Sequence, residues 1–374
     1  MSIRLAFSTL ACPQWTLTQA IEQAKAMGYQ GIELVTRFGR NTPDLACDPH
    51  QQDAAEIREK LKQAGIEAVC LSTNVSLTVK GHDHEQAAMK MARSAILQAA
   101  AIGAPMVRLL AWDVPAGEIV RQTLARVATQ ARELADFAGS QGVQILLENN
   151  GAIATGRDWW WCMDMIRHPM VALSWNVRSA ALAGEKPAIS IPMLNSRIRL
   201  VKLTDFTETG RPVQLGDGQL GAEKVLHRLM GIGYSGFVSV EWDRLSDASL
   251  ASAEEVLPEA RTRLTGWLDA VAQAAESKKP PRKTLPAAAA AIAAKAAASK
   301  AAVAKPAGDA SPEAQAAEAV STARSLPDAA AIRAAKIAAA QAQAEARRKA
   351  KAEEEAASQN QSGEAGAAQA DTPQ

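Results

Sequence analysis

The chain has 374 residues, and its 41 lysines and arginines nearly balance its 40 aspartates and glutamates. This balance conceals two regions of different composition. All 15 aromatic residues lie at or before Trp267, and residues 1–277 carry 27 basic and 30 acidic side chains. Residues 278–374 contain 39 alanines, with 14 basic and 10 acidic side chains. The near-neutral first region argues against a dedicated DNA-binding surface there.

Hydropathy and cysteine spacing exclude further classes of protein. No apolar run approaches the roughly 18 residues that a membrane-spanning helix needs, so we expect no membrane span. The segment LAFSTLAC (5–12) faintly resembles an export signal, but two hydroxyl residues interrupt it, and we interpret it as a strand. We therefore expect a cytoplasmic protein. The paired spacing of a thiolate zinc site or a disulfide scaffold is missing among the four cysteines, Cys12, Cys47, Cys70 and Cys162.

Short apolar runs alternate with longer amphipathic stretches through the first region. In chain order, the pattern predicts strand 3–9, helix 17–27, strand 31–35, helix 53–64, strand 67–73, helix 85–102, strand 106–110, helix 117–138, strand 143–149, helix 157–166, strand 171–177, helix 188–196, strand 198–205, helix 222–230, strand 236–243 and helix 253–275. Eight strand–helix units predict a (β/α)8 TIM barrel over residues 1–276. A doubly wound open sheet is the competing fold, but no GxGxxG motif follows the first strand.

An alanine-rich, low-complexity sequence with lysine, glutamate and glutamine follows the barrel. Alanine favours helix, but no apolar stripe here is wide enough to pack on a core. We therefore predict a disordered or partly helical tail over residues 277–374. Residues 278–305 carry seven basic and no acidic side chains, which is typical of arms that contact nucleic acid or acidic surfaces. The alternative is a solvated extension without a partner.

Reactive groups of such barrels project from the carboxyl ends of the strands, where five polar residues follow apolar runs. Glu148 ends the fifth expected strand, and Asn176 lies in the sixth. The seventh contributes Lys202 and Asp205, and the eighth contributes Glu241. Because side chains alternate along a strand, we expect the two glutamates, the asparagine and the lysine to converge in the barrel mouth.

Several segments carry a resemblance to a known family. They are FSTLACPQWTLTQAIEQAKAMGYQGIEL (7–34), AAAIGAPMVRL (99–109), LLENNG (146–151) and LGDGQLGAEKVLHRLMGIGYSGFVSVEWD (215–243). Together they resemble the xylose isomerase-like TIM barrels, a family of sugar and sugar phosphate isomerases and epimerases. The resemblance covers about residues 3–270 and does not reach the tail.

The resemblance implies a divalent metal held by Glu, Asp, His and Glu from the last four strands. Glu148 and Glu241 match the two glutamates, whereas Asn176 stands at the aspartate position and Lys202 at the histidine position. Asp205 matches the aspartate that follows the seventh-strand ligand. Protonated lysine has no lone pair, and its charge repels a cation. We therefore expect no firmly bound Mn, Mg or Zn, and only Glu148 and Glu241 as ligands if a weak site survives.

Two functions remain open from the sequence. In an isomerase or epimerase that lacks the metal, Glu148 and Glu241 would move the proton, Lys202 would stabilise the oxyanion and Asn176 would bind the carbohydrate. The alternative is a non-catalytic barrel with an inert salt-bridge cluster that binds a carbohydrate or a partner protein. The sequence does not identify the sugar, its phosphorylation or the oligomeric state.

Two further residues are predicted to bind substrate in the barrel mouth. Glu33 follows the second strand together with Arg37, and the alternative for them is a solvated surface pair. Arg108 lies on the fourth strand, where it would contact either an anionic substrate or a carboxylate of the barrel. Asp205 completes the expected substrate-binding set.

Overall fold

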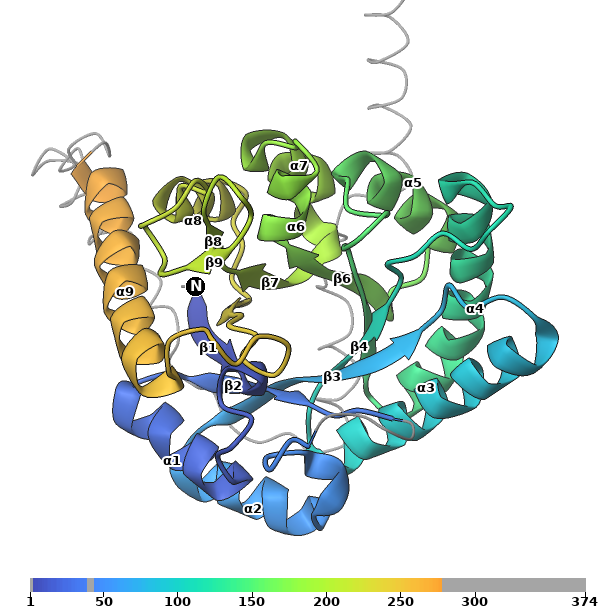
Figure 1. Cartoon of the computed structure of the whole chain (residues 1–374), viewed down its shortest axis with the longest axis horizontal. Coiled ribbons are helices and arrows are strands. Elements are labelled where there is room, and N and C mark those ends of the chain that lie inside the picture. The colour runs from blue at the N-terminus through green and yellow to red at the C-terminus, as the bar shows by residue number, and fades with distance from the viewer. Residues whose placement is uncertain (1–2, 39–43, 278–374) are drawn as a thin grey trace, which may run out of the picture. The chain divides into compact units, whose positions relative to one another are not determined.

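The computed structural model describes residues 3–38 and 44–277, and within these residues eight parallel strands close into a barrel. Their order around the barrel is β1-β10-β7-β6-β5-β4-β3-β2, so the predicted TIM barrel is confirmed. Figure 1 looks into this ring, with the helices outside it. The strands are β1 (Arg4–Ser8), β2 (Gly31–Val35), β3 (Glu67–Ser76), β4 (Met106–Leu110), β5 (Gln144–Glu148), β6 (Val171–Asn176), β7 (Ile198–Leu203) and β10 (Phe237–Val240).

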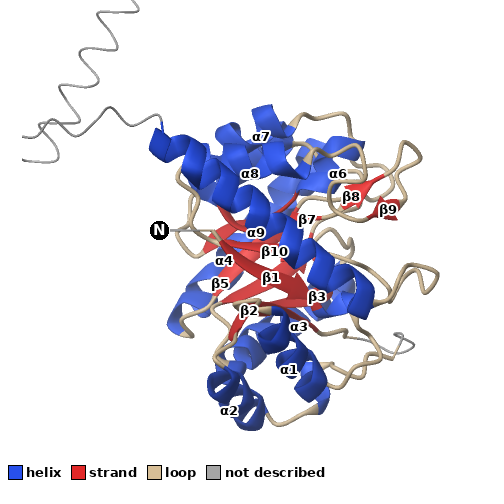
Figure 2. Ribbon diagram, turned by 90° about the vertical axis from the view of Figure 1, so that its left-hand side faces the viewer, coloured by secondary structure: helices blue, strands red, loops and turns tan. Residues whose placement is uncertain are grey.

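Helices follow the strands and cover the outside of the barrel, as Figure 2 shows from the side. They are α1 (Leu17–Met27), α2 (Ala54–Ala64), α3 (His82–Ile102), α4 (Val120–Ser140), α5 (Gly156–Ile166), α6 (Val177–Leu182), α7 (Pro187–Leu194), α8 (Ala222–Gly231) and α9 (Ala253–Ser277). The predicted boundary at residue 276 falls within the last turn of α9, one residue before Ser277, the last described residue. The predicted properties of the tail lie outside what the structure describes.

Helix α6 and a small hairpin were not predicted from the sequence. Helix α6 has only six residues, too few to show a helical period, and it begins where the Asn176 side chain accepts a hydrogen bond from the Ser179 backbone N–H. A small antiparallel hairpin, β8 (Asp205–Phe206) with β9 (Pro212–Val213), follows β7. Both additions lie at strand ends, where short polar segments carry no long hydrophobic pattern.

Apolar side chains pack in two separate clusters, one outside and one inside the ring of strands. Along β5, Ile145 and Leu147 belong to the outer cluster under the helices, whereas Leu146 belongs to the inner one. The inner cluster fills the floor of the barrel with Ala6, Val69, Cys70, Leu146, Ala172, Leu200 and Phe237. Since side chains alternate along a strand, Glu148, two residues beyond Leu146, also points inward and lies above this floor.

Gly31 lies where the inner cluster is tightest. A Cβ atom on Gly31 would lie 2.4 Å from Val69 Cγ2, 3.0 Å from Phe237 Cε1 and 3.1 Å from the Glu67 carbonyl oxygen. The missing side chain therefore provides the space that the valine and the phenylalanine fill. A larger residue would push them apart, because packed interiors have little free volume.

We predict that Gly31→Ala lowers the free energy of unfolding by about 1–3 kcal/mol, the usual cost of overpacking a core. Urea unfolding followed by tryptophan fluorescence measures the change. Gly231→Ala is the matched control, because nothing lies within 4 Å of a Cβ at Gly231. Equal stability of the two variants would contradict this account of the barrel floor.

Candidate functional site

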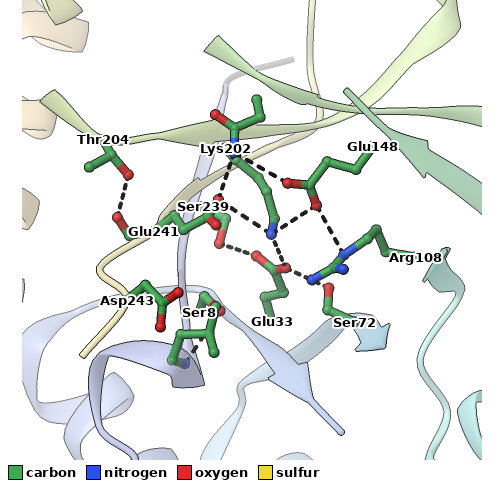
Figure 3. A network of polar contacts seen from close by, with 12 residues as sticks. Ser8, Glu33, Ser72, Arg108, Glu148, Lys202, Thr204, Ser239, Glu241 and Asp243 are labelled. Carbon is green, nitrogen blue, oxygen red and sulfur yellow. Dashed lines mark hydrogen bonds and ion pairs between the residues drawn. The ribbon is translucent and has the colours of Figure 1, made fainter. Parts of the chain in front are cut away.

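The amino group of Lys202 is surrounded by three carboxylates at the carboxyl ends of the strands (Figure 3). Its Nζ lies 3.1 Å from Glu33 Oε1, 3.1 Å from Glu148 Oε2 and 3.3 Å from Glu241 Oε2. Lys202 belongs to β7, Glu33 to β2 and Glu148 to β5, while Glu241 directly follows β10. The structure thus brings together the lysine and both glutamates expected in the mouth, and it adds Glu33 as a direct partner of the ammonium.

Strand register explains why these side chains meet. Lys202 pairs with Ser239 of β10 and with Asn176 of β6, and Glu148 pairs with Ser174 of β6. The residues directly before the lysine and the two glutamates belong to the outer apolar cluster, namely Val201, Leu147 and Val240. Alternation then turns the three charged side chains toward the barrel interior.

Arg108 adds a second positive charge beside Glu148. Its Nε lies 3.0 Å from Glu148 Oε2, and its Nη1 donates a hydrogen bond of 2.6 Å to the Thr73 carbonyl oxygen. The Thr73 hydroxyl in turn donates to the Arg108 carbonyl oxygen at 2.9 Å. The arginine therefore contacts a carboxylate of the barrel, and its contact with an anionic substrate stays a prediction.

Two serines hold the Glu33 carboxylate and were not singled out from the sequence. Ser72 Oγ donates to Glu33 Oε1 at 2.5 Å, and Ser239 Oγ donates to Glu33 Oε2 at 2.7 Å. Ser239 occupies an inward position of the otherwise apolar strand β10, and Ser72 directly follows the apolar run 68–71 of β3. A small hydroxyl residue at such a position is the sequence signal that indicates a buried polar partner.

Asn176 links the two predicted glutamates. Its Nδ2 donates to Glu148 Oε1 and to Glu241 Oε2, each at 3.2 Å, while its Oδ1 accepts from the Ser179 backbone N–H at 3.0 Å. An ionised aspartate could only accept, so it could not bridge the two carboxylates. The amide therefore matches a site in which three carboxylates already surround one ammonium.

Asp205, predicted to bind substrate, organises the loop that follows β7. Its Oδ1 accepts hydrogen bonds from the backbone N–H groups of Phe206 and Leu220, and its Oδ2 accepts from that of Gly216, each at 2.9 Å. A Cβ on Gly218 would lie 2.3 Å from Asp205 Oδ1, so the loop passes very close to this carboxylate. These contacts give Asp205 a positioning role, and its contact with substrate remains untested.

When all three carboxylates of the cluster are ionised, their negative charges outnumber the two positive charges of Lys202 and Arg108. Burial lowers the pKa of Lys202, but the surrounding carboxylates raise it further, so the pKa lies above its ordinary value. Burial also raises the pKa of Glu33, but Lys202 and Arg108 outweigh it and leave that pKa lowered. Burial raises the pKa of Glu241 to about 7, opposed by Lys202 and supported by Glu148. Glu241 is therefore the carboxyl that exchanges a proton near neutral pH.

Access to the cluster is unequal. The Glu33 and Glu148 side chains are fully buried and that of Lys202 is 1% exposed, whereas 17% of the Glu241 side chain is exposed. Asn176, at 7%, lies beside it. A ligand entering the mouth therefore meets Glu241 first.

The donor set does not fit the divalent metal that the resemblance implies. The Lys202 ammonium lies between the glutamates that would be ligands, and it offers no lone pair. Within residues 3–38 and 44–277, no group of three or more His, Cys, Asp or Glu side chains is arranged to hold a metal ion.

Comparisons with known proteins agree with this architecture. Residues 21–266 match a family model described as xylose isomerase-like TIM barrel. A search of curated proteins finds no match. In the described part of the chain, no helix has both the length and the apolar character needed to cross a membrane.

Solved structures of similar fold include several epimerases. A structure of L-ribulose 3-epimerase superposes with a TM-score of 0.64 at 14% identity, covering 75% of this chain and 100% of the other. The D-allulose 3-epimerase from Methylomonas sp. gives 0.59 at 18%, covering 71% and 98%. The IOLI protein with a bound zinc atom gives 0.62 at 18%, covering 72% and 99%. At these identities the likeness is one of fold.

We predict that Lys202→Met lowers the free energy of unfolding by about 3–5 kcal/mol, because buried carboxylates lose their shared cation. The loss depends on pH. Without the ammonium, the folded-state pKa values of the glutamates rise above their unfolded values, and stability conferred by such groups is lost as pH rises. The destabilisation relative to wild type should therefore be smallest near pH about 5 and grow toward pH about 8.

Thermal unfolding of both proteins across this pH range measures the effect. Lys224→Met provides the control, because Lys224 is exposed on α8 and forms no ion pair within the described residues. A constant difference between Lys202→Met and wild type at all pH values would contradict the assigned charge cluster.

Proposed function

We propose, because the chain belongs to the xylose isomerase-like TIM barrel family, that it is an isomerase or epimerase that moves a proton on a carbohydrate. The observation that carries this proposal is the Lys202 ammonium held among three carboxylates, of which Glu241 is accessible. In the proposal this ammonium takes over the electrostatic role of a metal ion. Asn176 and Lys202 then stand at two of the four positions where the resemblance implies metal ligands. The ligand is a small carbohydrate, and the protein acts in cytoplasmic carbohydrate metabolism.

The proposed reaction begins when Glu241 removes the proton from a carbon next to a carbonyl group. The electron pair of that C–H bond forms a carbon–carbon double bond, the π pair of the carbonyl group moves onto its oxygen, and the Lys202 ammonium stabilises the resulting oxyanion. Return of the proton to the former carbonyl carbon, with transfer of the neighbouring hydroxyl proton to the oxyanion, gives an isomer. Return to the opposite face of the original carbon, with the carbonyl group restored, gives an epimer. Two positioned carboxyl groups are needed when removal and return occur on different faces.

Asn176 lies between the Glu148 and Glu241 carboxylates, at the position from which a ligand could contact both. Its Nδ2 lies 3.2 Å from Glu148 and from Glu241, so a ligand group that took the place of this N–H would meet both. In the proposal, Glu148 is the second proton carrier and Asn176 binds a substrate hydroxyl. Glu33 holds Lys202 in position, and Arg108 holds Glu148. In the proposal, Glu33 and Arg108 therefore act on the substrate through these partners and do not contact it directly.

Burial of the cluster favours a second candidate function, a barrel that binds a carbohydrate or a partner protein without catalysis. Glu148 and Glu33 are fully buried, and Arg108 and Lys202 already satisfy much of their charge. Such a network is stable without any substrate. A catalytic reading requires Glu148 to become accessible, whereas a binding function requires only Glu241 and Asn176.

We predict that Glu241→Gln lowers the rate of proton exchange by about 100-fold or more, the usual contribution of a general acid–base group. Deuterium incorporation from D2O into a panel of aldoses and ketoses measures exchange whether or not an isomer accumulates. With wild type, kcat/KM should rise with pH through about 7, because Glu241 must be ionised to accept the proton.

Glu223→Gln is the control, since Glu223 is exposed in the first turn of α8. Exchange that survives Glu241→Gln removes this residue from the mechanism. A wild type that binds sugars but exchanges no deuterium with any of them establishes the non-catalytic function instead.

We also predict that the double variant Asn176→Asp with Lys202→His acquires manganese binding, because it restores a carboxylate and an imidazole beside Glu148 and Glu241. Titration calorimetry with manganese, supported by metal analysis of the dialysed protein, compares it with wild type. Tight manganese binding by the unmodified protein would refute our interpretation of the two substitutions.

A further inference from the structure

Arg178 lies above the charge cluster and takes no part in it. It is the second residue of α6, which begins directly after β6, and it is half-buried. β7 separates β6 from β10 in the barrel, and the charge of Arg178 interacts with those of Glu241 and Asp243 beyond β10. Asn176, two residues before Arg178, contacts Glu241, and Arg178 Nη2 bonds to the Gly210 carbonyl oxygen. The arginine therefore lies at the rim of the mouth, between Asn176 and the β8–β9 hairpin.

Within the described residues, the guanidinium of Arg178 forms one hydrogen bond, and its other N–H donors have no partner. Its Nη2 donates to the carbonyl oxygen of Gly210, in the turn of the β8–β9 hairpin, at 2.5 Å. Its Nε is buried and has no hydrogen-bond partner. No carboxylate of the described residues lies within 4.0 Å of it, whereas Arg108, on β4, is paired with Glu148 at 3.0 Å.

The two nearby carboxylates are engaged elsewhere. Glu241 accepts from Asn176 and contacts Lys202, and Asp243 accepts from the backbone N–H and the hydroxyl of Ser246. Burial lowers the pKa of Arg178, and these carboxylates oppose the shift only in part. A half-buried cation without a carboxylate partner is unfavourable unless something else supplies the negative charge.

A structural role does not require this residue. Anchoring the hairpin turn takes one N–H donor, which a neutral side chain could provide. Arginine instead presents several N–H groups in a rigid planar fork, a geometry that matches phosphate and carboxylate oxygens.

We propose that Arg178 binds an anionic group on the ligand, so that the natural ligand is a sugar phosphate or a sugar acid rather than a neutral sugar. This inference rests on the proposed carbohydrate site and names its ligand class. The anionic group is held at Arg178 while the polyol chain extends toward Asn176 and Glu241. The hydrogen bond to Gly210 keeps the β8–β9 hairpin beside the bound anion.

The experiment compares three probes of one carbon skeleton: D-fructose, D-fructose 6-phosphate and D-fructuronate. Titration calorimetry on the full chain gives the affinity for each. We expect wild type to bind at least one anionic probe about tenfold or more tightly than D-fructose. Only an anionic probe can accept charge-assisted hydrogen bonds from Arg178, and these bonds add binding free energy of this size. Comparison of the phosphate with the carboxylate identifies which anion the site takes.

Arg178→Gln should abolish the preference for the anionic probe, and Arg178→Lys should retain part of it, because lysine keeps the charge but not the fork. Arg211→Gln is the matched control, since Arg211 is exposed on the same hairpin and bonds to Ser249. An anion preference of Arg178→Lys between those of wild type and Arg178→Gln also shows that the binding site is still folded in this variant.

Equal affinity for neutral and anionic probes, absence of binding by both anionic probes, or a preference that survives Arg178→Gln overturns the inference. Its failure is distinct from failure of the proposed function. Anion preference that depends on Arg178, without deuterium exchange, supports the ligand class and rejects catalysis. Exchange on neutral sugars without any anion preference supports catalysis and rejects the ligand class.

Discussion

Electrostatic attraction between one ammonium and three carboxylates is the constraint around which the barrel mouth is built. Buried charges are tolerated only when partners and hydrogen bonds replace the water they lose. Glu33 receives two serine hydroxyls, Glu148 receives Arg108, and Asn176 donates to Glu148 and Glu241. Removal of any one partner would leave another charge unsatisfied, so these residues act as one network and their contributions are not additive.

The fold followed from the sequence because eight strand–helix repeats carry long hydrophobic patterns, and side-chain alternation predicted the convergence of Lys202 with Glu148 and Glu241. Shorter features did not follow. Helix α6 and the β8–β9 hairpin depend on individual side-chain contacts, which leave no periodic signal. The central place of Glu33 could not be read from local sequence either, because it depends on register across the closed barrel, where β2 faces the strands that carry its partners.

Lys202 stands where the resemblance implies a metal-binding histidine, and this difference involves more than one residue. A tethered ammonium carries one charge and donates three hydrogen bonds, whereas a divalent ion carries two charges and accepts lone pairs. Asn176 fits the first arrangement, because an additional carboxylate would increase the excess of negative charge. The two departures from the pattern that the resemblance implies are therefore physically coupled. Burial raises the pKa of Glu241, and the charges of Glu148 and Glu33 add to this shift.

The apolar floor of the barrel has a kinetic consequence. Leu146, Leu200 and Phe237 close the end below the charged cluster, so a molecule that reaches Glu241 must enter and depart through the same opening. Incoming and outgoing molecules then compete for one passage, beside the hairpin that Asp205 and Arg178 hold in place. In the proposed reaction, product that accumulates would occupy the passage through which substrate enters and would slow turnover.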